Sequence, residues 1–195
     1  TLMKIDERIQ KQRQTGTKQQ TMEEYQYEKE IVRVIENNIF GIDINHEAVI
    51  IARLSMFLKM STGRRKLTDL SKNIQVGNSI VDDESIAGIK AFDWEEQFHE
   101  KFDIVIGNPP YVRVQLIPHK EIDWYKENKK TAFQRIDVSL FFFELAKHVL
   151  KPKGMVGFIS TNAFQVAKYG KNMRKFLLEE FRILKLIDFN SLQVF

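Results

Sequence analysis

The sequence of 195 residues predicts an α/β fold, a mainly parallel sheet flanked by helices. One observation is that short apolar runs recur without polar alternation, at 39–43, 104–107 and 155–160. This pattern is typical of parallel strands that are buried on both faces. The other is that longer segments with helical periodicity separate such runs, the order expected of β–α–β units.

The composition narrows the class of protein. A 43% share of hydrophobic residues is enough for the core of one domain. The absence of cysteine excludes a disulfide framework and a thiolate metal site, and it fits a reducing cytoplasm. The four histidines are not paired at ligand spacing, so no metal is expected. The net charge of +4 mildly favours a polyanionic partner, and no apolar run is long enough to span a membrane.

The first third of the chain predicts a tail and then alternating helices and strands. Residues 1–21 are rich in glutamine and charge, which indicates a tail or linker before a domain at 22–195. An amphipathic helix begins at Met22 and ends at 37–38, before the strand 39–43. Asn45 is placed to cap a further helix, about 47–60, and an alternating strand follows at 73–76.

The stretch that dominates the sequence is the strand 104–107 and the four residues after it. Asn108, Pro109, Pro110 and Tyr111 cannot continue a sheet, because neither proline has an N–H to donate. Residues that precede a proline are restricted to extended backbone, which stiffens this segment. The result is a rigid polar loop at the carboxyl end of a parallel strand, where open α/β sheets bind their ligands.

Such a loop suits methylation of a planar amino group. The nitrogen of an aromatic amine or amide is a poor nucleophile, because its lone pair is delocalised. The Asn108 side-chain oxygen and the Pro109 carbonyl are candidate acceptors for its two N–H bonds, and they would stabilise the positive charge that grows during transfer. Tyr111 is a candidate for stacking on the ring. The simpler alternative is a proline-stiffened turn with an incidental tyrosine.

The segments around this loop are less regular. Residues 81–101 are acidic and loop-like, and 112–136 form a long predicted loop that mixes basic with aromatic residues. Its bases suit contacts to nucleic-acid phosphates, although a plain solvated loop fits equally well; the candidates are Arg113, Lys129 and Lys130. Asp137 is placed to cap a helix at 139–150, and a helix near 172–181 precedes a final strand at 183–189.

Asn108, Pro109, Pro110 and Tyr111 form the signature Asn-Pro-Pro-Tyr of S-adenosylmethionine-dependent amino-methyltransferases. Over about residues 31–195 the chain resembles the Eco57I-type N6-adenine DNA methyltransferases of restriction-modification systems. The resemblance implies a partial Rossmann-like class I methyltransferase fold, with S-adenosyl-L-methionine as the cofactor. It also implies a flipped-out adenine in double-stranded DNA as the substrate, with target-recognition and possibly nuclease domains elsewhere in the full-length protein.

The resemblance assigns further residues to the cofactor and the base. Asp43 would bind the cofactor ribose, although an Asx turn or helix cap is the common alternative for an acid after a strand. Ile44 would pack on the cofactor adenine, and the turn at Asn78 and Ser79 would meet it; the family commonly has aspartate where this chain has Asn78. Phe195 would be a second aromatic wall for the flipped base; the alternative is a core or disordered terminal phenylalanine.

The family's first motif, a Phe-x-Gly-x-Gly turn after the first strand, does not occur in these 195 residues. This segment alone is therefore expected to be inactive. The strands 39–43 and 102–107 are expected to pair directly with each other; the alternative is that a second copy of the chain fills the space between them. Two other functions stay open. One is amino-methylation of RNA adenine or protein glutamine; the other is a non-catalytic nucleic-acid-binding module derived from a methyltransferase.

Overall fold

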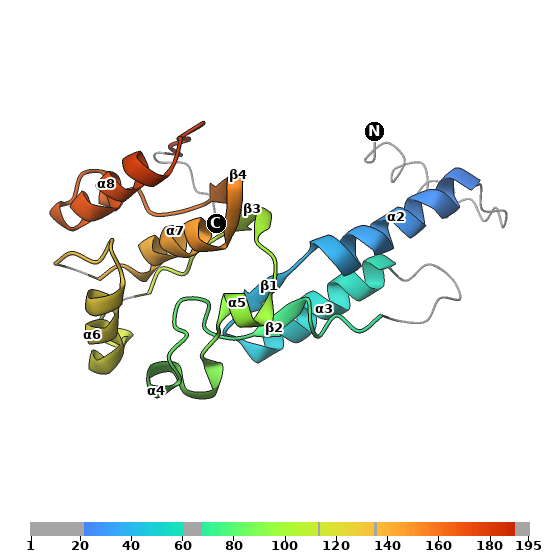
Figure 1. Ribbon diagram of the computed structural model, residues 1–195, viewed down its shortest axis with the longest axis horizontal. Coiled ribbons are helices and arrows are strands. Elements are labelled where there is room, and N and C mark those ends of the chain that lie inside the picture. The colour runs from blue at the N-terminus through green and yellow to red at the C-terminus, as the bar shows by residue number, and fades with distance from the viewer. Residues whose placement is uncertain (1–21, 61–67, 113, 135, 190–195) are drawn as a thin grey trace. The chain divides into compact units, whose positions relative to one another are not determined.

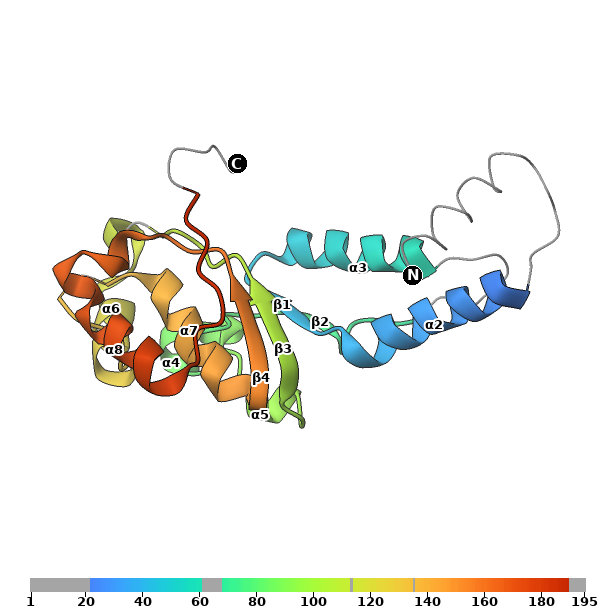
Figure 2. The ribbon, with the colours of Figure 1, turned by 90° about the horizontal axis from the view of Figure 1, so that it is seen from above.

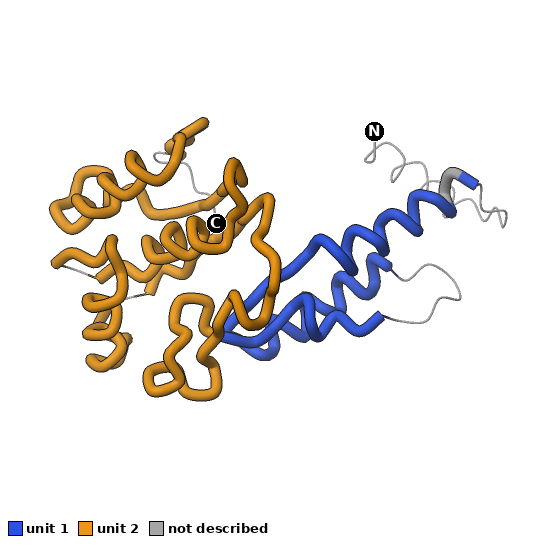
Figure 3. The backbone as a smooth tube through the Cα atoms, viewed as in Figure 1, with its two compact units in different colours: residues 1–77 blue, residues 78–195 orange. Residues whose placement is uncertain are grey.

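The computed structural model describes residues 22–60, 68–112, 114–134 and 136–189. It has an α/β architecture in which parallel strands are flanked by helices, as the sequence predicts (Figure 1). The chain divides into two compact units, 1–77 and 78–195, which are described separately (Figure 3). The predicted tail at 1–21 lies outside the described residues.

Unit 1 is a β–α–β arrangement preceded by a helix. Its elements, in order, are α2 (Met22–Asn38), β1 (Gly41–Asp43), α3 (His46–Met60) and β2 (Ile74–Val76). The two strands are parallel, with Gly41 opposite Ile74 and Asp43 opposite Val76. All four elements were predicted from the sequence, with ends that differ by one or two residues.

Local polar contacts and a small core hold unit 1 together. The buried amide of Asn73 donates to the carbonyl oxygens of Glu36, at 2.9 Å, and Ile39, at 3.2 Å, and so satisfies carbonyls at the end of α2. The Asn45 side chain accepts from the backbone N–H of Ala48 at 2.9 Å, which confirms the predicted cap of α3. Beneath them lies an apolar cluster from both helices and the segment before β2, formed by Val32, Ile35, Met60 and Leu70.

Unit 2 contains the second parallel pair. Its longer elements are β3 (Phe102–Gly107), α6 (His119–Asn128), α7 (Val138–Val149), β4 (Leu150–Phe158) and α8 (Lys171–Glu180). Shorter helices are α4 (Glu84–Ala87), α5 (Trp94–Gln97) and the 3₁₀ turns η1 (Gly88–Lys90), η2 (Val114–Leu116), η3 (Ala163–Gln165) and η4 (Lys168–Gly170). β3 and β4 are parallel, with Ile104 opposite Met155 and Gly107 opposite Phe158.

Helix α7 covers one face of this strand pair and begins where the sequence predicts. The Asp137 carboxylate accepts from the backbone N–H of Ser139 at 3.1 Å, which is the expected cap. Phe143 of α7 meets Phe158 of β4 edge to face, with ring centroids 5.0 Å apart, and α7 lies beside the strands in Figures 1 and 2. The phenylalanine-rich turn of α7 also packs inward: Phe141 is fully buried, in the cluster that also contains Tyr125.

The predicted burial of β3 and β4 on both faces is wrong for the structure described. Ile104 is 56% exposed, Ile106 is 79% exposed and Met155 is 53% exposed. In the parallel register these side chains share one face, opposite the face that α7 covers. The apolar run signals a strand whose two faces are both apolar, but burial requires a second layer, which none of the described residues of unit 2 provides.

The direct pairing of the strands at 39–43 and 102–107, which belong to different units, stays a prediction. β1 pairs with β2, and β3 pairs with β4, in two separate two-stranded sheets. Each strand therefore pairs with the next strand along the chain, across one crossover.

Three further expectations are corrected. The final strand at 183–189 is not formed; this segment has no regular structure, and its apolar side chains are exposed at Ile183, Leu184, Leu186, Ile187 and Phe189. A strand needs a neighbour that accepts and donates hydrogen bonds, and no described strand is in register with it. The loop-like segment 81–101 contains α4 and α5, which Asp83 and Asp93 cap, and the long loop 112–136 contains α6.

Aromatic side chains pack against one another at the start of β3. Trp94 meets Phe102 edge to face at 6.0 Å between ring centroids, and Phe98 meets Phe102 at 5.7 Å. Within the described ranges, no helix combines the length and apolar character that a bilayer crossing needs.

Candidate functional site

The four residues after β3 form a loop that is anchored at one point and open elsewhere. The Pro109 ring is buried, whereas Asn108, Pro110 and Tyr111 are exposed. A buried proline next to exposed polar groups fixes the backbone and leaves the side chain of Asn108 accessible. The loop begins where Gly107 lies opposite Phe158, at the carboxyl end of the β3–β4 pair. This is the edge at which parallel sheets bind ligands.

The acceptor oxygen of Asn108 is only weakly engaged. The Tyr111 hydroxyl donates to Asn108 Oδ1 at 3.4 Å, which is long for a hydrogen bond between a hydroxyl and an oxygen. The Tyr111 ring is 49% exposed, so one part of it packs on the protein and the rest is free to stack. The loop therefore presents an accessible carbonyl acceptor beside a half-exposed aromatic ring.

A second loop, after β4, lies directly beside the first. The backbone N–H of Ile159 donates to the Gly107 carbonyl at 3.2 Å and so continues the parallel ladder to the start of the loop. The hydroxyls that follow, Ser160 Oγ and Thr161 Oγ1, are buried and have no hydrogen-bond partner among the described residues. Sequence reasoning did not select these two residues. The available signal was a pair of hydroxyl residues immediately after an apolar strand.

Asp43 and Ile44 lie at the carboxyl end of β1, in unit 1. Asp43 Oδ1 accepts from the backbone N–H of Asn45 at 2.8 Å, so the carboxylate does form the Asx turn that is the common alternative for such a residue. Its Oδ2 atom makes no such bond within the described residues, and Asp43 is exposed. Ile44 is exposed as well. A free carboxylate oxygen beside an exposed branched side chain fits the ribose and adenine of a nucleoside.

Asn78 and Ser79 form a tight turn at the start of unit 2. Asn78 Oδ1 accepts from the backbone N–H groups of Ile80, at 3.1 Å, and Val81, at 3.3 Å. The Ser79 carbonyl accepts from the indole N–H of Trp94 at 3.0 Å. The oxygen of Asn78 therefore stabilises its own turn, and the amide nitrogen is the group left to meet a ligand.

The predicted DNA contacts differ in their surroundings. The Lys129 ammonium lies 4.9 Å from the centroid of the Trp124 ring, and burial lowers the pKa of Lys129, an effect that the nearby Glu144 and Asp82 carboxylates oppose. Lys130 is exposed, and its backbone N–H donates to Glu144 at 3.1 Å. Lys130 is thus positioned by its backbone and free at its side chain. Arg113 and Phe195 lie outside the described residues.

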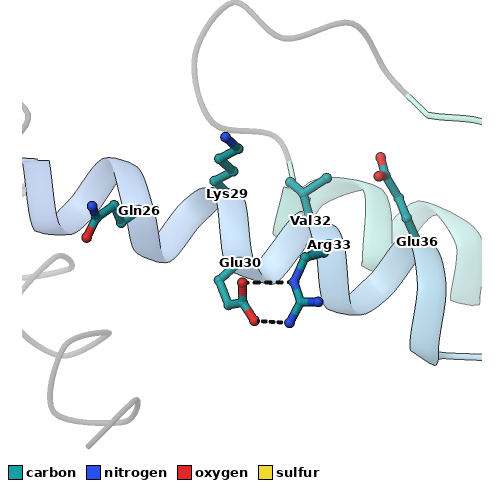
Figure 4. Close-up of a pocket in the computed structure, with 6 residues that line it drawn as sticks. All are labelled: Gln26, Lys29, Glu30, Val32, Arg33 and Glu36. Carbon is teal, nitrogen blue, oxygen red and sulfur yellow. Dashed lines mark hydrogen bonds and ion pairs between the residues drawn. The ribbon is translucent and has the colours of Figure 1, made fainter.

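Two other features of the described residues do not form a site. A depression on α2 is lined by residues of that helix alone: Gln26, Lys29, Glu30, Val32, Arg33 and Glu36 (Figure 4). Its main polar pair is already satisfied, because Arg33 donates to both carboxylate oxygens of Glu30, at 2.6 and 3.0 Å. No group of three or more His, Asp or Glu side chains is arranged to hold a metal ion in the part of the chain that the structure describes.

Comparison with known proteins identifies similar sequences. The family model of the Eco57I restriction-modification methylases matches residues 37–195. The type II restriction enzyme and methyltransferase RM.Eco57I of Escherichia coli is 35% identical over 80% of this chain and 17% of its own length. The type II methyltransferase M.XhoI of Xanthomonas vasicola is 40% identical over 48% of this chain and 17% of its own length.

The description of one more distant relative specifies a base, adenine. The adenine-specific methyltransferase PglX of Streptomyces coelicolor is 27% identical over 73% of this chain and 14% of its own length. The chain thus spans less than a fifth of the length of each of these relatives.

Proposed function

The chain belongs to the Eco57I restriction-modification methylase family, and from this premise we propose that it methylates the exocyclic amino group of an adenine flipped out of double-stranded DNA. The observation that carries the proposal is the loop after β3. It presents the exposed Asn108 next to the half-exposed Tyr111 ring, with the buried Pro109 between them, at the carboxyl end of a parallel strand pair. The name of the adenine-specific relative supports adenine as the base.

The residues of the loop supply positioning and charge stabilisation. S-adenosyl-L-methionine, when bound, supplies the electrophilic methyl group. Asn108 Oδ1 and the Pro109 carbonyl each accept a hydrogen bond from one N–H of the amino group. These two hydrogen bonds orient the nitrogen so that its lone pair leaves conjugation with the ring. As the new C–N bond forms, positive charge grows on this nitrogen, and the two acceptors stabilise it without reorganisation. The surplus proton leaves to water, so no strong base is needed.

Stacking and cofactor contacts complete the site. Tyr111 stacks on the adenine and fixes its plane relative to the two acceptors, while Pro110 keeps the loop extended. In unit 1, Asp43 Oδ2 fits the ribose hydroxyls and Ile44 fits the face of the cofactor adenine. In unit 2, the amide nitrogen of Asn78, in the turn with Ser79, is available to donate to a ligand. Target recognition is assigned to other parts of the full-length protein.

The proposal is tested by supplying the full-length protein with methyl-labelled cofactor and three substrates: double-stranded DNA, RNA and protein. Label recovered as N6-methyladenine in DNA is the expected result. Label in RNA adenine or in protein glutamine would show that the substrate is RNA or protein and not DNA. Nucleic-acid binding without any transfer of label would show that the protein is a non-catalytic binding module, and it would contradict the proposed activity.

Replacing Asp43 with asparagine is expected to weaken cofactor binding about tenfold or more. Asparagine keeps an oxygen for the turn to Asn45 but loses the charge and the second acceptor, and hydrogen bonds to charged groups contribute about 1.5–3 kcal/mol. Calorimetric titration of the full-length protein measures the Kd. The matched control is Asp69→Asn, because Asp69 Oδ1 accepts from the Ser71 N–H at the same 2.8 Å in the same unit. Equal cofactor affinities for the two variants would show that Asp43 only stabilises its turn with Asn45 and does not bind the cofactor.

Replacing Lys130 with alanine is expected to weaken DNA binding at every sequence and to reduce the slope of log K against log salt by about one. Its side chain is exposed and available to a phosphate, whereas the Lys129 ammonium is held on Trp124. Titrations of the full-length protein at several salt concentrations give the slope. Lys101→Ala, at an exposed lysine before β3, is the control; a slope that changes equally in both variants would remove Lys130 from the DNA surface.

A further inference from the structure

Two hydroxyl groups beside the Asn108 loop are buried without a partner. Ser160 Oγ and Thr161 Oγ1 have almost no exposed surface, and no described atom lies within hydrogen-bonding geometry of either. A buried hydroxyl that makes no hydrogen bond is destabilising, and native structures rarely retain one without a reason. Here two such groups occur on consecutive residues, next to the loop that the proposed chemistry uses.

The two prolines of the neighbouring loop end the backbone ladder just before these hydroxyls. The parallel ladder between β3 and β4 continues to the bond from the Ile159 N–H to the Gly107 carbonyl. Beyond it, Pro109 and Pro110 follow Asn108 on the β3 side, and neither has an N–H to donate. The ladder therefore ends, and the polar groups of Ser160 and Thr161 are left at the same sheet edge as the exposed Asn108.

We propose that Ser160 and Thr161 are positioning residues for the target base, and that one of their hydroxyls donates to a ring nitrogen flanking the adenine amino group. The inference rests on the proposed function and extends it from the amino group to the ring. Adenine presents an amino donor flanked by acceptor nitrogens, N1 on one side and N7 on the other. The protein side is complementary: the loop after β3 offers acceptors, Asn108 Oδ1 and the Pro109 carbonyl, and the loop after β4 offers donors.

Access to these groups requires the two loops to separate. Both hydroxyl oxygens are covered in this structure. Among the described residues, the ladder between the loops ends at the Ile159 bond, and the buried Pro109 fixes the loop after β3, so the movement is assigned to the loop after β4. The binding of the base would exchange an unpaired hydroxyl for a hydrogen-bonded one. That change favours the bound state over the free state, so the groups contribute to affinity and specificity rather than to stability.

The stability test compares Thr161→Val with Thr131→Val in the full-length protein. The valine in each variant has nearly the shape of threonine and lacks only the hydroxyl. The Thr131 hydroxyl is buried and donates to Glu144 at 2.6 Å, so its removal is expected to lower the Tm. Thr161→Val and Ser160→Ala are expected to leave the Tm unchanged or raise it. A fall in Tm as large as that of Thr131→Val would show a structural hydrogen bond and overturn the proposal.

The binding test measures kcat/KM on DNA whose target adenine is replaced by 7-deazaadenine or 1-deazaadenine. Each analogue keeps the amino group and lacks one flanking ring nitrogen. For the unmodified protein, at least one analogue is expected to lower kcat/KM about three- to tenfold, the effect of one hydrogen bond. In the Ser160→Ala, Thr161→Val double variant this penalty is expected to disappear, whereas in Thr131→Val it is expected to persist.

The outcomes separate the inference from the function on which it rests. If the unmodified protein methylates adenine but shows no penalty with either analogue, or if the double variant keeps the full penalty, the assignment of Ser160 and Thr161 is wrong and the proposed function stands. If the unmodified protein does not methylate adenine in DNA, the proposed function fails and the inference fails with it.

Discussion

Replacing Asn108 with alanine is expected to lower the rate of methyl transfer a hundredfold or more while leaving the protein folded. The loss of one preorganised hydrogen-bonding group aimed at developing charge costs about 3–4 kcal/mol in the transition state. The Asn108 side chain is exposed and accepts only a long bond from the Tyr111 hydroxyl among the described residues, so its removal opens no cavity and leaves no buried group unpaired. The effect should therefore fall on kcat and not on stability.

The measurement is single-turnover transfer of labelled methyl groups to DNA by the full-length protein, together with its thermal unfolding. Asn37→Ala is the matched control, because Asn37 is also exposed and its amide donates to the Arg33 carbonyl of its own helix. A rate for Asn108→Ala within a few-fold of that control would remove Asn108 from the catalytic site. A large fall in Tm would instead assign it a structural role.

Replacing Gly170 with alanine is expected to destabilise unit 2 by about 3 kcal/mol or more. A Cβ atom at this position would lie 1.9 Å from the Phe164 carbonyl oxygen and 2.6 Å from its carbon. Both are backbone atoms, which cannot rotate away as a side chain would, so the chain itself must move. Gly170 precedes α8, whose Met173 and Phe176 pack with Phe164 and Leu140 of α7.

Chemical unfolding of the full-length variant, read by a probe in unit 2, gives the change in the free energy of unfolding. Gly157→Ala is the control, because a Cβ there would meet only the Ile106 side chain, at an ordinary 3.7 Å. The Arg174 guanidinium donates to the carbonyls of Phe164, at 2.6 Å, and Ala167, at 2.9 Å, which restrains the backbone that would have to move. If both glycine variants are equally stable, Arg174 does not restrain the Phe164 backbone, and that backbone can move to make room for a Cβ atom at position 170.

The helices and their caps can be predicted from the sequence, because residues close together in the chain determine them. Apolar periodicity predicts α2, α3, α7 and α8, and the side chains of Asn45 and Asp137 cap their helices as their positions predict. α6 was not predicted, since the segment has few apolar residues in helical spacing. Its formation depends on tertiary packing: Tyr125 is buried against Phe141 of α7, with ring centroids 4.8 Å apart.

The chemical content of the candidate site is likewise local. The order of a strand, an amide, two prolines and an aromatic ring is enough to indicate amino-group chemistry. Geometry adds what the order does not contain. Asp43 divides its two oxygens between a turn and solvent, Asn78 uses its oxygen for its own turn, and Lys129 lies on Trp124 while Lys130 stays free.

The sequence by itself located the strands that form among the described residues, most of the longer helices, the helix caps and the Asn-Pro-Pro-Tyr loop, because each depends on side chains a few residues apart. Tertiary structure alone decided that β1 pairs with β2 and β3 with β4, that Ile104, Ile106 and Met155 are exposed, and that 183–189 form no strand. It also placed the unpaired Ser160 and Thr161 hydroxyls beside the Asn108 loop. Strand pairing and burial depend on which distant segment supplies the neighbouring backbone or the covering layer, and an apolar run has the same pattern whether or not that neighbour is present.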